Sequence, residues 1–464
     1  MDKLLYKIKK LIPRKLFKVL QPAYHFLLSW LAAFLYCRPS EKIIVIGVTG
    51  TTGKTTSVYL IAKMLESAGY KAGYTSTAMF NDGRKEWLND KKMTMVGRLF
   101  TQRMLRQMVK NKCQYAIIET TSEGIIQNRH RFINYDILVF TGLYPEHIDS
   151  HGGFANYKEA KGKLFQHLKR CQTKYVNDRK YVSSFINNIK KIDFNRVKKT
   201  IIVNYDDKHK DYFLSFWAEE RFGFTKNLST EANNNIKLIK FSDIKVEANG
   251  TSFITEGTGI KMQLLGDFNV ANVMAAISVG LSQNLEIERI KRGIENVKGV
   301  PGRIERIDEG QNFTVIVDYA FEPRAVEKLY KTIKLIPHNK VIHVFGSAGG
   351  GRDMARRPQL GKIAGEKADI AIITDEDPYD EDPRIIIDQV AIGAEHVGKK
   401  LNQNLFKISD RREAIKKALA MAEENDIVLI TGKGSEQAIC VKNGEKITWD
   451  DRGVVRGILG NRGK

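Results

Sequence analysis

The sequence predicts an α/β protein in which a central phosphate-loop ATPase domain with a mixed or parallel sheet precedes a C-terminal Rossmann-like α/β domain. Two observations predict this fold class. A glycine-rich loop follows an apolar run, Ile43–Ile46, and opens a helix-forming stretch. After residue 300, apolar runs alternate with helical stretches, which is typical of a second parallel sheet. For 464 residues we predict a short N-terminal segment over 1–40 and domains over 41–299 and 300–464.

The N-terminal segment is basic at first and then apolar. Met1–Lys18 has seven lysine and arginine residues against one aspartate, with leucine and isoleucine at helical spacing, which predicts a basic amphipathic helix. Val19–Cys37 is apolar and aromatic but is interrupted by polar residues and Pro22, so it is borderline for a membrane span of about 20 apolar residues. We expect an in-plane or re-entrant membrane anchor; a span and a helix docked on the core are the alternatives. A cleaved signal is not expected, because no small-residue cleavage site is present.

The glycine-rich loop is a predicted phosphate loop. It lies between a strand and a helix, where backbone N–H groups and the positive helix end can face a polyphosphate. Lys54 is expected to hold the β- and γ-phosphates, and the Thr55 hydroxyl to contact Mg²⁺. An ordinary glycine- and threonine-rich turn is the simpler alternative, which the flanking elements disfavour. The predicted nucleotide-binding residues of the loop are Thr49, Gly50, Thr51, Thr52, Gly53, Lys54, Thr55 and Thr56.

Two further apolar strands end in polar segments. Gln114–Glu119 ends in a carboxylate, which at a strand end is expected to lie over the phosphate loop. Thr121 and Ser122 follow it and are candidate substrate contacts. Tyr135–Thr141 leads into a loop with the sequence Glu-His-Ile-Asp around His147, and a helix then starts that contains Lys161.

In order and spacing, these motifs resemble the Mur ligases, ATP-dependent amide-bond-forming enzymes of peptidoglycan precursor synthesis. The resemblance rests on the Thr-Gly-Thr-Thr-Gly-Lys-Thr-Thr core, Glu119, the Glu-His-Ile-Asp segment and the pair Ala160-Lys161. It runs from about Lys42 to the C-terminus and is closest to the branch that adds the third, usually diamino, residue of the stem peptide. It implies a cytoplasmic, monomeric ligase that acts on a UDP- or lipid-linked muramyl peptide and an amino acid. Family members usually carry a UDP-binding domain before the loop, for which the residues before Lys42 are too few.

The chemistry of such a ligase explains the polar residues. ATP must convert a carboxylate to an acyl phosphate, and the negative charge that develops is stabilised by cationic side chains and by Mg²⁺, for which we expect two ions. The predicted metal ligands are Thr55, Glu119, His147 and Lys161, and the predicted catalytic residues are Lys54, Glu119, His147 and Lys161. The resemblance implies that Lys161 carries a carbamate formed with CO₂. Taken singly, His147 would be a solvated loop residue and Lys161 a surface cation.

Downstream, Asn269 and Asn272 are spaced i and i+3 and lie on one helix face. Asparagine near a helix start is usually a cap, but the resemblance assigns this pair to the nucleotide base. Turn-forming residues over Val297–Arg303 mark the domain boundary. The resemblance places Arg303 at the hinge and Asp318 in a loop that faces the nucleotide, whereas Phe321 departs from the histidine that is common there.

The amino-acid site is where the sequence departs most from the family pattern. Relatives that add diaminopimelate carry Asp-Asn-Pro-Arg, whereas this chain has Asp377 and Tyr379 in an acidic run. Tyrosine cannot make the bidentate carboxylate contact of arginine, so the run favours a cationic tail such as that of lysine or ornithine. A solvated acidic turn is the alternative. Gly432 and Glu436 belong to a Gly-Lys-Gly-Ser-Glu segment, and Glu436 could receive the substrate ammonium.

The charge of the chain bears on its partners. The net charge is +22, but lysine and arginine are spread along the chain, so we expect no nucleic acid and a bias toward anionic substrates and peripheral contact with anionic lipid at the inner face of the cell membrane. Four cysteines without metal-ligand spacing suit a reducing cytosol. Two alternatives remain: another Mur-like amide ligase, of folate/polyglutamate or peptidoglycan-amidation type, and a phosphate-loop ATPase that is not a ligase.

Overall fold

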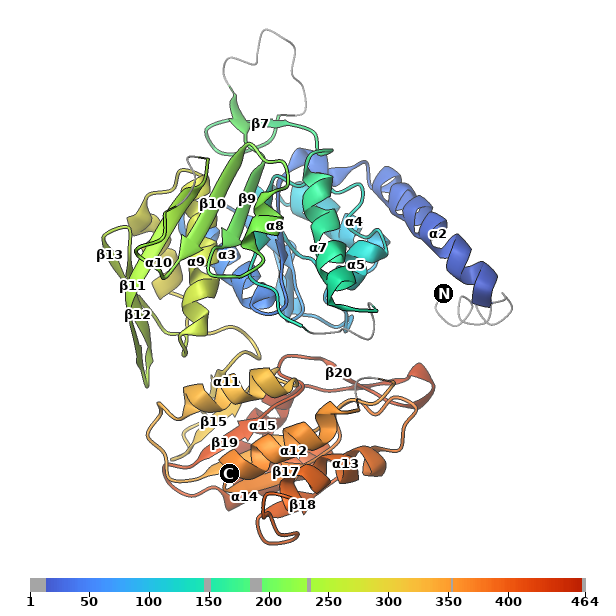
Figure 1. Cartoon of the computed structure of the whole chain (residues 1–464), viewed down its shortest axis with the longest axis vertical. Coiled ribbons are helices and arrows are strands. Elements are labelled where there is room, and N and C mark those ends of the chain that lie inside the picture. Colours follow the sequence, from blue (N-terminus) through green and yellow to red (C-terminus); the bar gives the residue numbers. More distant parts are fainter. Residues whose placement is uncertain (1–13, 146–151, 184–193, 232–234, 352–353, 461–464) are drawn as a thin grey trace.

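The computed structural model describes residues 14–145, 152–183, 194–231, 235–351 and 354–460. Two α/β bodies are stacked along the long axis of the molecule, and the N-terminal helix α2 (Arg14–Leu35) lies on the outside of the first (Figure 1). The chain passes from the first sheet to the second between Glu295 and Glu305, around the predicted boundary at residue 300.

The first sheet has 11 strands within the described ranges. The strands from β11 to β2 run parallel to their neighbours, and an antiparallel hairpin extends each end. Its middle strands are buried on both faces and therefore read as continuous apolar runs. In spatial order the strands are β13 (Thr258–Met262), β12 (Gly250–Thr255), β11 (Lys237–Glu247), β10 (Glu220–Thr225), β9 (Thr200–Asn204), β6 (Ile137–Phe140), β1 (Ile44–Thr49), β5 (Tyr115–Glu119), β2 (Ala72–Thr75), β3 (Met79–Asn81) and β4 (Glu86–Leu88).

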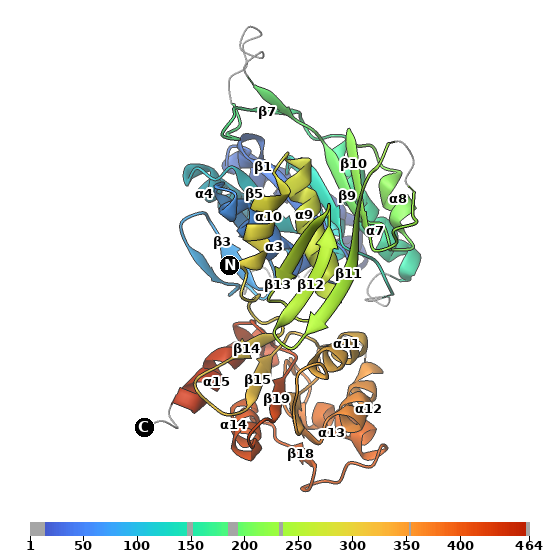
Figure 2. The ribbon, with the colours of Figure 1, turned by 90° about the vertical axis from the view of Figure 1, so that its left-hand side faces the viewer.

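Helices cover both faces of this sheet and form two separate apolar cores. One core includes side chains of α3 (Lys54–Ser67), α9 (Phe268–Ser282) and α10 (Ile287–Glu295). The other includes side chains of α4 (Arg98–Lys110), α5 (Ser122–Ile126), α7 (Phe154–Leu168) and α8 (Lys210–Leu214). A short 3₁₀ helix, η1 (Pro39–Lys42), leads into β1, and β7 (Lys174–Val176) pairs with β8 (Asn195–Val197) at the far end (Figure 2).

The second sheet has six strands in the described part of the chain, and all but the first pair are parallel. In spatial order they are β14 (Glu305–Ile307), β15 (Thr314–Val317), β19 (Ile427–Ile430), β16 (Val341–Phe345), β17 (Ile370–Ile373) and β18 (Leu405–Lys407). The helices are α11 (Pro323–Ile333), α12 (Arg356–Lys367) and α13 (Pro383–Glu395) on one face, and α14 (Arg411–Met421) and α15 (Asp451–Gly460) on the other. A hairpin follows β19 and comprises β20 (Ala438–Cys440), η3 (Lys442–Gly444) and β21 (Lys446–Thr448).

The N-terminal helix differs from the sequence expectation. The sequence divides the segment at residue 18 into a basic amphipathic helix and an apolar anchor, whereas α2 runs unbroken from Arg14 through Pro22 to Leu35. The remainder of the predicted basic helix, residues 1–13, lies outside the described ranges. None of the helices described here combines the length and hydropathy that a membrane span requires.

A buried ion pair joins the last helix, α15, to the start of α14. Arg411 donates from Nε and Nη2 to the two carboxylate oxygens of Asp451, at 2.8 and 2.7 Å, and both side chains are buried. Burial alone would lower the pKa of Arg411, but Asp451 holds it above its usual value. Such a pair costs desolvation energy to form and is expensive to break on one side only.

We therefore predict that Asp451→Asn lowers the free energy of unfolding by about 3–5 kcal/mol, because it leaves the Arg411 charge buried without its counterion. Asp388→Asn is the control, since Asp388 pairs with Lys407 at the exposed surface and should cost about 1 kcal/mol or less. Urea unfolding of both variants measures the difference. Equal losses in the two would contradict the assignment.

Candidate active site

The phosphate loop connects β1 to α3 at the edge of the first sheet that faces the second body. Glycine is required at two of its positions by close approach. A Cβ on Gly53, whose φ is +79°, would lie 2.2 Å from Oδ1 of Asn272, and one on Gly50 would lie 2.0 Å from Oγ1 of Thr141. The loop is therefore held between the segment directly after β6 and the first turns of α9.

The threonines of the loop anchor it to its neighbours. Thr49 Oγ1 donates to the carbonyl oxygen of Thr120 at 2.8 Å, and the carbonyl oxygen of Thr52 accepts from Thr141 Oγ1 at 2.6 Å. Thr51 Oγ1 lies 3.3 Å from the hydroxyl of Tyr157 on α7. Thr56 is buried within the first turn of α3. These contacts fix the loop against β5, β6 and α7.

Thr55 and Glu119 meet as the sequence predicts. Thr55 Oγ1 lies 3.0 and 3.1 Å from the two oxygens of the Glu119 carboxylate, which is 1% exposed. The carboxylate also accepts from the backbone N–H and the hydroxyl of Thr77, at 2.7 and 3.0 Å. Sequence reasoning missed Thr77, because it follows β2 without a recognisable motif. Hydroxyl and carboxylate oxygens at a phosphate loop are the donors that Mg²⁺ prefers, so the pair fits that ion.

Two lysines lie against the loop. Lys54 Nζ donates to the carbonyl oxygen of Thr51 at 2.7 Å. Lys161 is buried on α7, donates from Nζ to the carbonyl oxygen of Gly50 at 2.8 Å, and lies 4.6 Å from the ring centre of Tyr157. His147 lies outside the described residues, and within them no three His, Cys, Asp or Glu side chains gather as a ready metal site.

The two asparagines of α9 lie beside the loop. Asn272 Nδ2 donates to Asn269 Oδ1 at 2.9 Å, and Asn269 Nδ2 donates to the carbonyl oxygen of Leu265 at 2.8 Å. The helix cap is Asp267, so neither asparagine is the cap residue. Their contact with the nucleotide base remains a prediction.

The predicted substrate contacts after β5 have local roles. Thr121 caps α5, because its Oγ1 accepts from the backbone N–H of Gly124 at 3.1 Å. Ser122 is buried in the first turn of that helix.

Arg303 links the two bodies at the phosphate loop. Its Nη2 lies 3.5 Å from Thr55 Oγ1, and its guanidinium stacks 4.3 Å above the ring centre of Tyr319. Asp318 holds the turn, accepting from the backbone N–H groups of Ile304 and Ala320 at 2.7 and 2.6 Å. Burial raises the pKa of the Asp318 carboxyl, while Arg303 and these N–H groups oppose the shift. The structure thus gives Asp318 a positioning role beside the predicted nucleotide contact.

A pocket of about 240 Å³ lies between the two bodies. One wall is the first-body segment Lys91–Met93, and the rest comes from the loops of the second body. Its volume is below the range of drug-sized ligand sites, about 300–1,000 Å³, and suits a smaller molecule. The lining residues are Lys91, Lys92, Met93, Tyr319, Phe321, Glu376, Asp377, Tyr379, Gly432, Glu436, Cys440 and Lys446.

Four charged side chains form a cluster in this pocket. Lys92 bonds to the Asp377 carboxylate and lies 3.3 Å from Glu436, and Lys433 contacts the same two carboxylates at 3.0 and 2.7 Å. Burial would raise the pKa of the Asp377 carboxyl, but the two lysines hold it below its usual value. Asp377 and Glu436 are thus paired with protein lysines, and their contact with a substrate cation remains a prediction.

Glu376 is a pocket residue that sequence reasoning missed. Its side chain is 4% exposed, and Oε2 has no hydrogen-bond partner among the described residues. Burial raises the pKa of this carboxyl, with Arg356 opposing the shift. Gly432 has a φ of +101°, and a Cβ there would lie 2.4 Å from Glu376 Oε2, so glycine is needed to make room for the carboxylate. Nothing in the acidic run distinguished Glu376 from its neighbours.

Comparison with known proteins identifies the family. The profile of the Mur ligase middle domain matches residues 48–199 and 190–280, and that of the Mur ligase glutamate ligase domain matches residues 302–434. The chain is a Mur ligase. The predicted family, the α/β fold class and the class of ATP-dependent, amide-bond-forming ligase of peptidoglycan synthesis are confirmed.

Two relatives and one solved structure are similar to this Mur ligase over most of its length. A UDP-N-acetylmuramyl-tripeptide synthetase of Roseiflexus sp. (strain RS-1) is 37% identical over 94% of this chain and 82% of that protein. A UDP-N-acetylmuramoyl-L-alanyl-D-glutamate–2,6-diaminopimelate ligase of Geobacillus kaustophilus is 33% identical over 93% of this chain and 82% of that protein. The solved structure of Mycobacterium tuberculosis folylpolyglutamate synthase matches with a TM-score of 0.63 over 94% of this chain and 95% of that one, at 15% identity. That last likeness shows the fold alone, so the folate-type alternative is not favoured.

The position of Lys54 in the phosphate loop gives a direct prediction. Lys54→Ala should lower amino-acid-dependent phosphate release at least about 100-fold, because it removes a cation that stabilises the transferring phosphoryl group. Lys71→Ala, which changes an exposed lysine just before β2, is the control and should keep full turnover. Steady-state phosphate release measures both, and retained turnover in Lys54→Ala would refute the assignment.

Proposed function

We propose that this Mur ligase adds a diamino acid such as lysine to the carboxylate of a UDP- or lipid-linked muramyl peptide through an acyl phosphate. The choice of a diamino acid rests on Glu376, a buried residue that lines the pocket between the bodies. Its carboxylate oxygen Oε2 has no hydrogen-bond partner in the described structure. Arg303 and the phosphate loop lie at the same junction, so ATP and the amino acid would approach the acceptor from two sides.

The reaction follows from this arrangement. An oxygen of the acceptor carboxylate attacks the γ-phosphorus of ATP, the bond to the β,γ-bridging oxygen breaks, and ADP leaves. Lys54 and the loop N–H groups bind the phosphates during this step. Thr55 and Glu119 would hold Mg²⁺, which when bound neutralises phosphate charge. The amine of the amino acid then attacks the acyl carbon, the bond to the phosphate oxygen breaks, and the amine loses a proton as the amide forms.

Lys161 is proposed to act as a carbamate. A neutral lysine amine combines with CO₂ and releases a proton, which turns the side chain into an anion with two oxygens. The position of Lys161, buried on α7 with Nζ beside the loop carbonyl of Gly50, supports this proposal because an anion there could serve as a ligand for a divalent cation at the phosphate loop.

We predict that Lys161→Ala is nearly inactive and that a small carboxylate such as acetate partly restores it by supplying the missing anion. Lys163→Ala is the matched control, because Lys163 is on the same helix but exposed, with only a 3.8 Å pair to Glu159. Phosphate release with and without acetate is the measurement. A mass showing plain lysine at 161 in a fully active, metal-loaded enzyme would count against the carbamate.

Several features of the pocket support a cationic side chain on the amino acid. Glu376 offers a carboxylate oxygen without a partner, whereas Lys92 is already paired with Asp377 and Glu436 and is not available to a substrate carboxylate. Tyr379 stands where diaminopimelate-adding relatives have arginine and cannot replace its bidentate contact. A lysine or ornithine ammonium would donate a hydrogen bond to Glu376 Oε2 and offset the cost of burying that carboxylate.

The test is product formation with ATP, a panel of amino acids and either UDP-linked or lipid-linked muramyl dipeptide, followed by mass. We predict a higher kcat/KM for lysine or ornithine than for meso-diaminopimelate. Glu376→Gln should lower kcat/KM for lysine about 100-fold, through loss of a charge-assisted contact of about 2–3 kcal/mol. Asp380→Asn, at an exposed neighbour, is the control. The preference for lysine or ornithine would be overturned if kcat/KM for diaminopimelate were about tenfold higher than kcat/KM for lysine, which corresponds to about 1.4 kcal/mol.

The cellular setting is part of the same proposal. We propose that the enzyme acts as a monomer in the cytoplasm, where ATP and the precursor substrates are available. The basic residues of 1–18 and the aromatic face of α2 support peripheral contact with the anionic inner face of the cell membrane.

A further inference from the structure

The outward face of α2 is apolar from Leu20 to Leu35. Eight large apolar side chains of α2 are each more than 40% exposed, and all of them except Phe26 fall at helical spacing on one side of the helix. Trp30 and Phe34 stack with ring centres 5.7 Å apart. We call this face the α2 stripe; it comprises Leu20, Tyr24, Leu27, Trp30, Leu31, Phe34 and Leu35.

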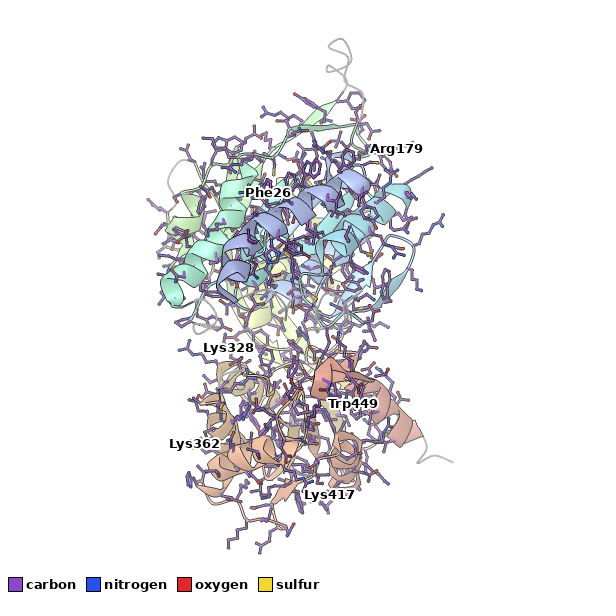
Figure 3. The ribbon with its side chains drawn as sticks, turned by 90° about the vertical axis from the view of Figure 1, so that its right-hand side faces the viewer. Phe26, Arg179, Lys328, Lys362, Lys417 and Trp449 are labelled. Carbon is purple, nitrogen blue, oxygen red and sulfur yellow. The ribbon has the colours of Figure 1, made fainter. Side chains whose placement is uncertain are left out.

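The orientation of the stripe is fixed by the opposite face of the helix. Ser29 is buried, accepts from Arg98 Nε at 2.9 Å and donates to the carbonyl oxygen of Asn128 at 2.9 Å. Ala32 and Ala33 are buried, and Phe26 meets Phe132 edge to face, 5.2 Å between ring centres. The helix lies along the surface with Phe26 near its middle (Figure 3). The stripe is therefore held away from the core by specific contacts of the other side.

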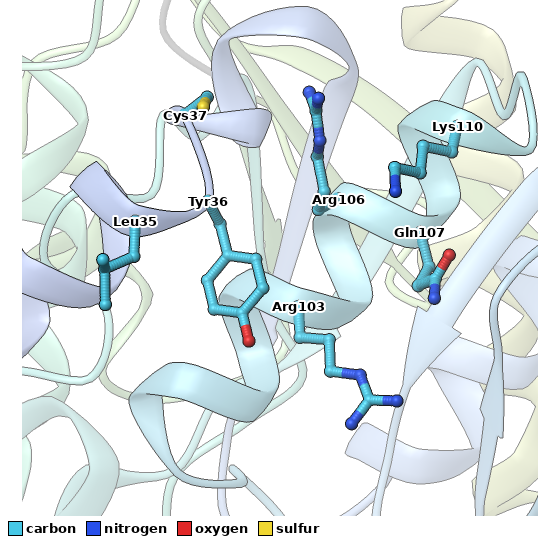
Figure 4. A pocket seen from close by; sticks show the side chains of 7 residues that line it. All are labelled: Leu35, Tyr36, Cys37, Arg103, Arg106, Gln107 and Lys110. Carbon is cyan, nitrogen blue, oxygen red and sulfur yellow. The ribbon is translucent and has the colours of Figure 1, made fainter.

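A basic pocket of about 410 Å³ adjoins the C-terminal end of the stripe. Three cations from α4, spaced i, i+3 and i+7, line it beside Leu35, Tyr36 and Cys37 (Figure 4). None of the three has a carboxylate within 4.0 Å among the described residues, and no acidic residue lines the pocket. We call it the α4 pocket, and its cations are Arg103, Arg106 and Lys110.

The α2 stripe and the α4 pocket together indicate which kind of ligand binds this part of the surface. An apolar stripe rich in aromatic residues beside cations without counterions matches a ligand that is both apolar and anionic. A second copy of this chain fits poorly, because an isologous contact pairs the same surface of both copies and would bring two basic surfaces together. A soluble anion would use the pocket but leave the stripe in water.

We propose that the α2 stripe and the α4 pocket form one binding surface for an anionic phospholipid membrane. The stripe enters the interface in the membrane plane, and Arg103, Arg106 and Lys110, which extend in different directions from α4 (Figure 4), contact the phosphates of lipid headgroups. The inference rests on the proposed membrane contact and adds the second element, α4, that no sequence feature indicated. The folded body of the enzyme, and not only the N-terminal segment, then contributes to the binding of anionic lipid.

The test uses the full-length protein and vesicles of phosphatidylglycerol with phosphatidylcholine, or of phosphatidylcholine alone. Arg103→Gln, Arg106→Gln and Lys110→Gln combined should weaken binding to the anionic vesicles about 100-fold, at about fivefold per cation near the surface. The control removes the same charge from exposed lysines of the second body, Lys334→Gln, Lys367→Gln and Lys400→Gln, and should change binding less than about threefold. Leu31→Asp with Phe34→Asp should abolish binding. Unchanged ATP turnover in each variant shows that it is folded.

The outcomes separate the two proposals. If the full-length protein ignores anionic vesicles at low salt, both the membrane contact and this inference fall. If it binds and the α4 triple variant matches the control triple, only the α4 pocket is overturned. Binding of inorganic phosphate to the pocket by calorimetry without vesicle binding would assign it to a soluble anion instead. A lipid-free dimer that Phe34→Asp converts to monomer would assign the stripe to a second copy.

Discussion

The buried carboxylate of Glu119 is the interaction on which the catalytic end of the molecule depends. It lies at the end of β5 and accepts hydrogen bonds from Thr55 on the phosphate loop and from Thr77 after β2. A carboxylate with 1% exposure would be costly without such partners, so its neighbours are constrained to stay within hydrogen-bond reach. The loop, β5 and the segment after β2 are thereby held in one geometry before any nucleotide arrives, which is the preorganisation that phosphoryl transfer requires.

The second body is joined to this end through charge. Arg303 reaches Thr55 from the turn before β14, and Lys92 crosses from the first body to Asp377 and Glu436. Both contacts are made by residues of the segments that connect the helices and strands. Such segments can hold functional residues while the sheets remain rigid. The pocket between the bodies and the phosphate loop are therefore supported by different sheets and brought together by a few side chains.

Much of this was predictable because the signals are local. The apolar runs after residue 300 form the second sheet, as their alternation with helical stretches predicts. Thr55 and Glu119 meet because a strand-turn-helix motif and a strand-end carboxylate determine their own positions. The continuous helix through Pro22 was not predicted, since tertiary contacts at Ser29 stabilise a helix that local propensity would interrupt.

The residues that escaped prediction depend on contacts distant in sequence. Thr77 is 42 residues from Glu119, and Lys92 is 285 residues from Asp377. Glu376 stands out only once burial and the glycine at 432 are known, because its neighbours have the same charge. Sequence pattern carries residue type and spacing, whereas these features arise from the packing of one loop on another.

The pocket between the bodies is lined by residues of both, and this has a thermodynamic consequence. Since Lys91, Lys92 and Met93 come from one body and the remaining lining residues come from the other, the complete pocket exists only while the two bodies are in contact. By linkage, any ligand that binds the complete pocket must favour the associated arrangement, by RT ln(1 + [L]/Kd). Any such ligand is thus coupled to the association of the two bodies even where it touches no residue of the connecting segment, and the Lys92 charge pairs favour that association without the ligand.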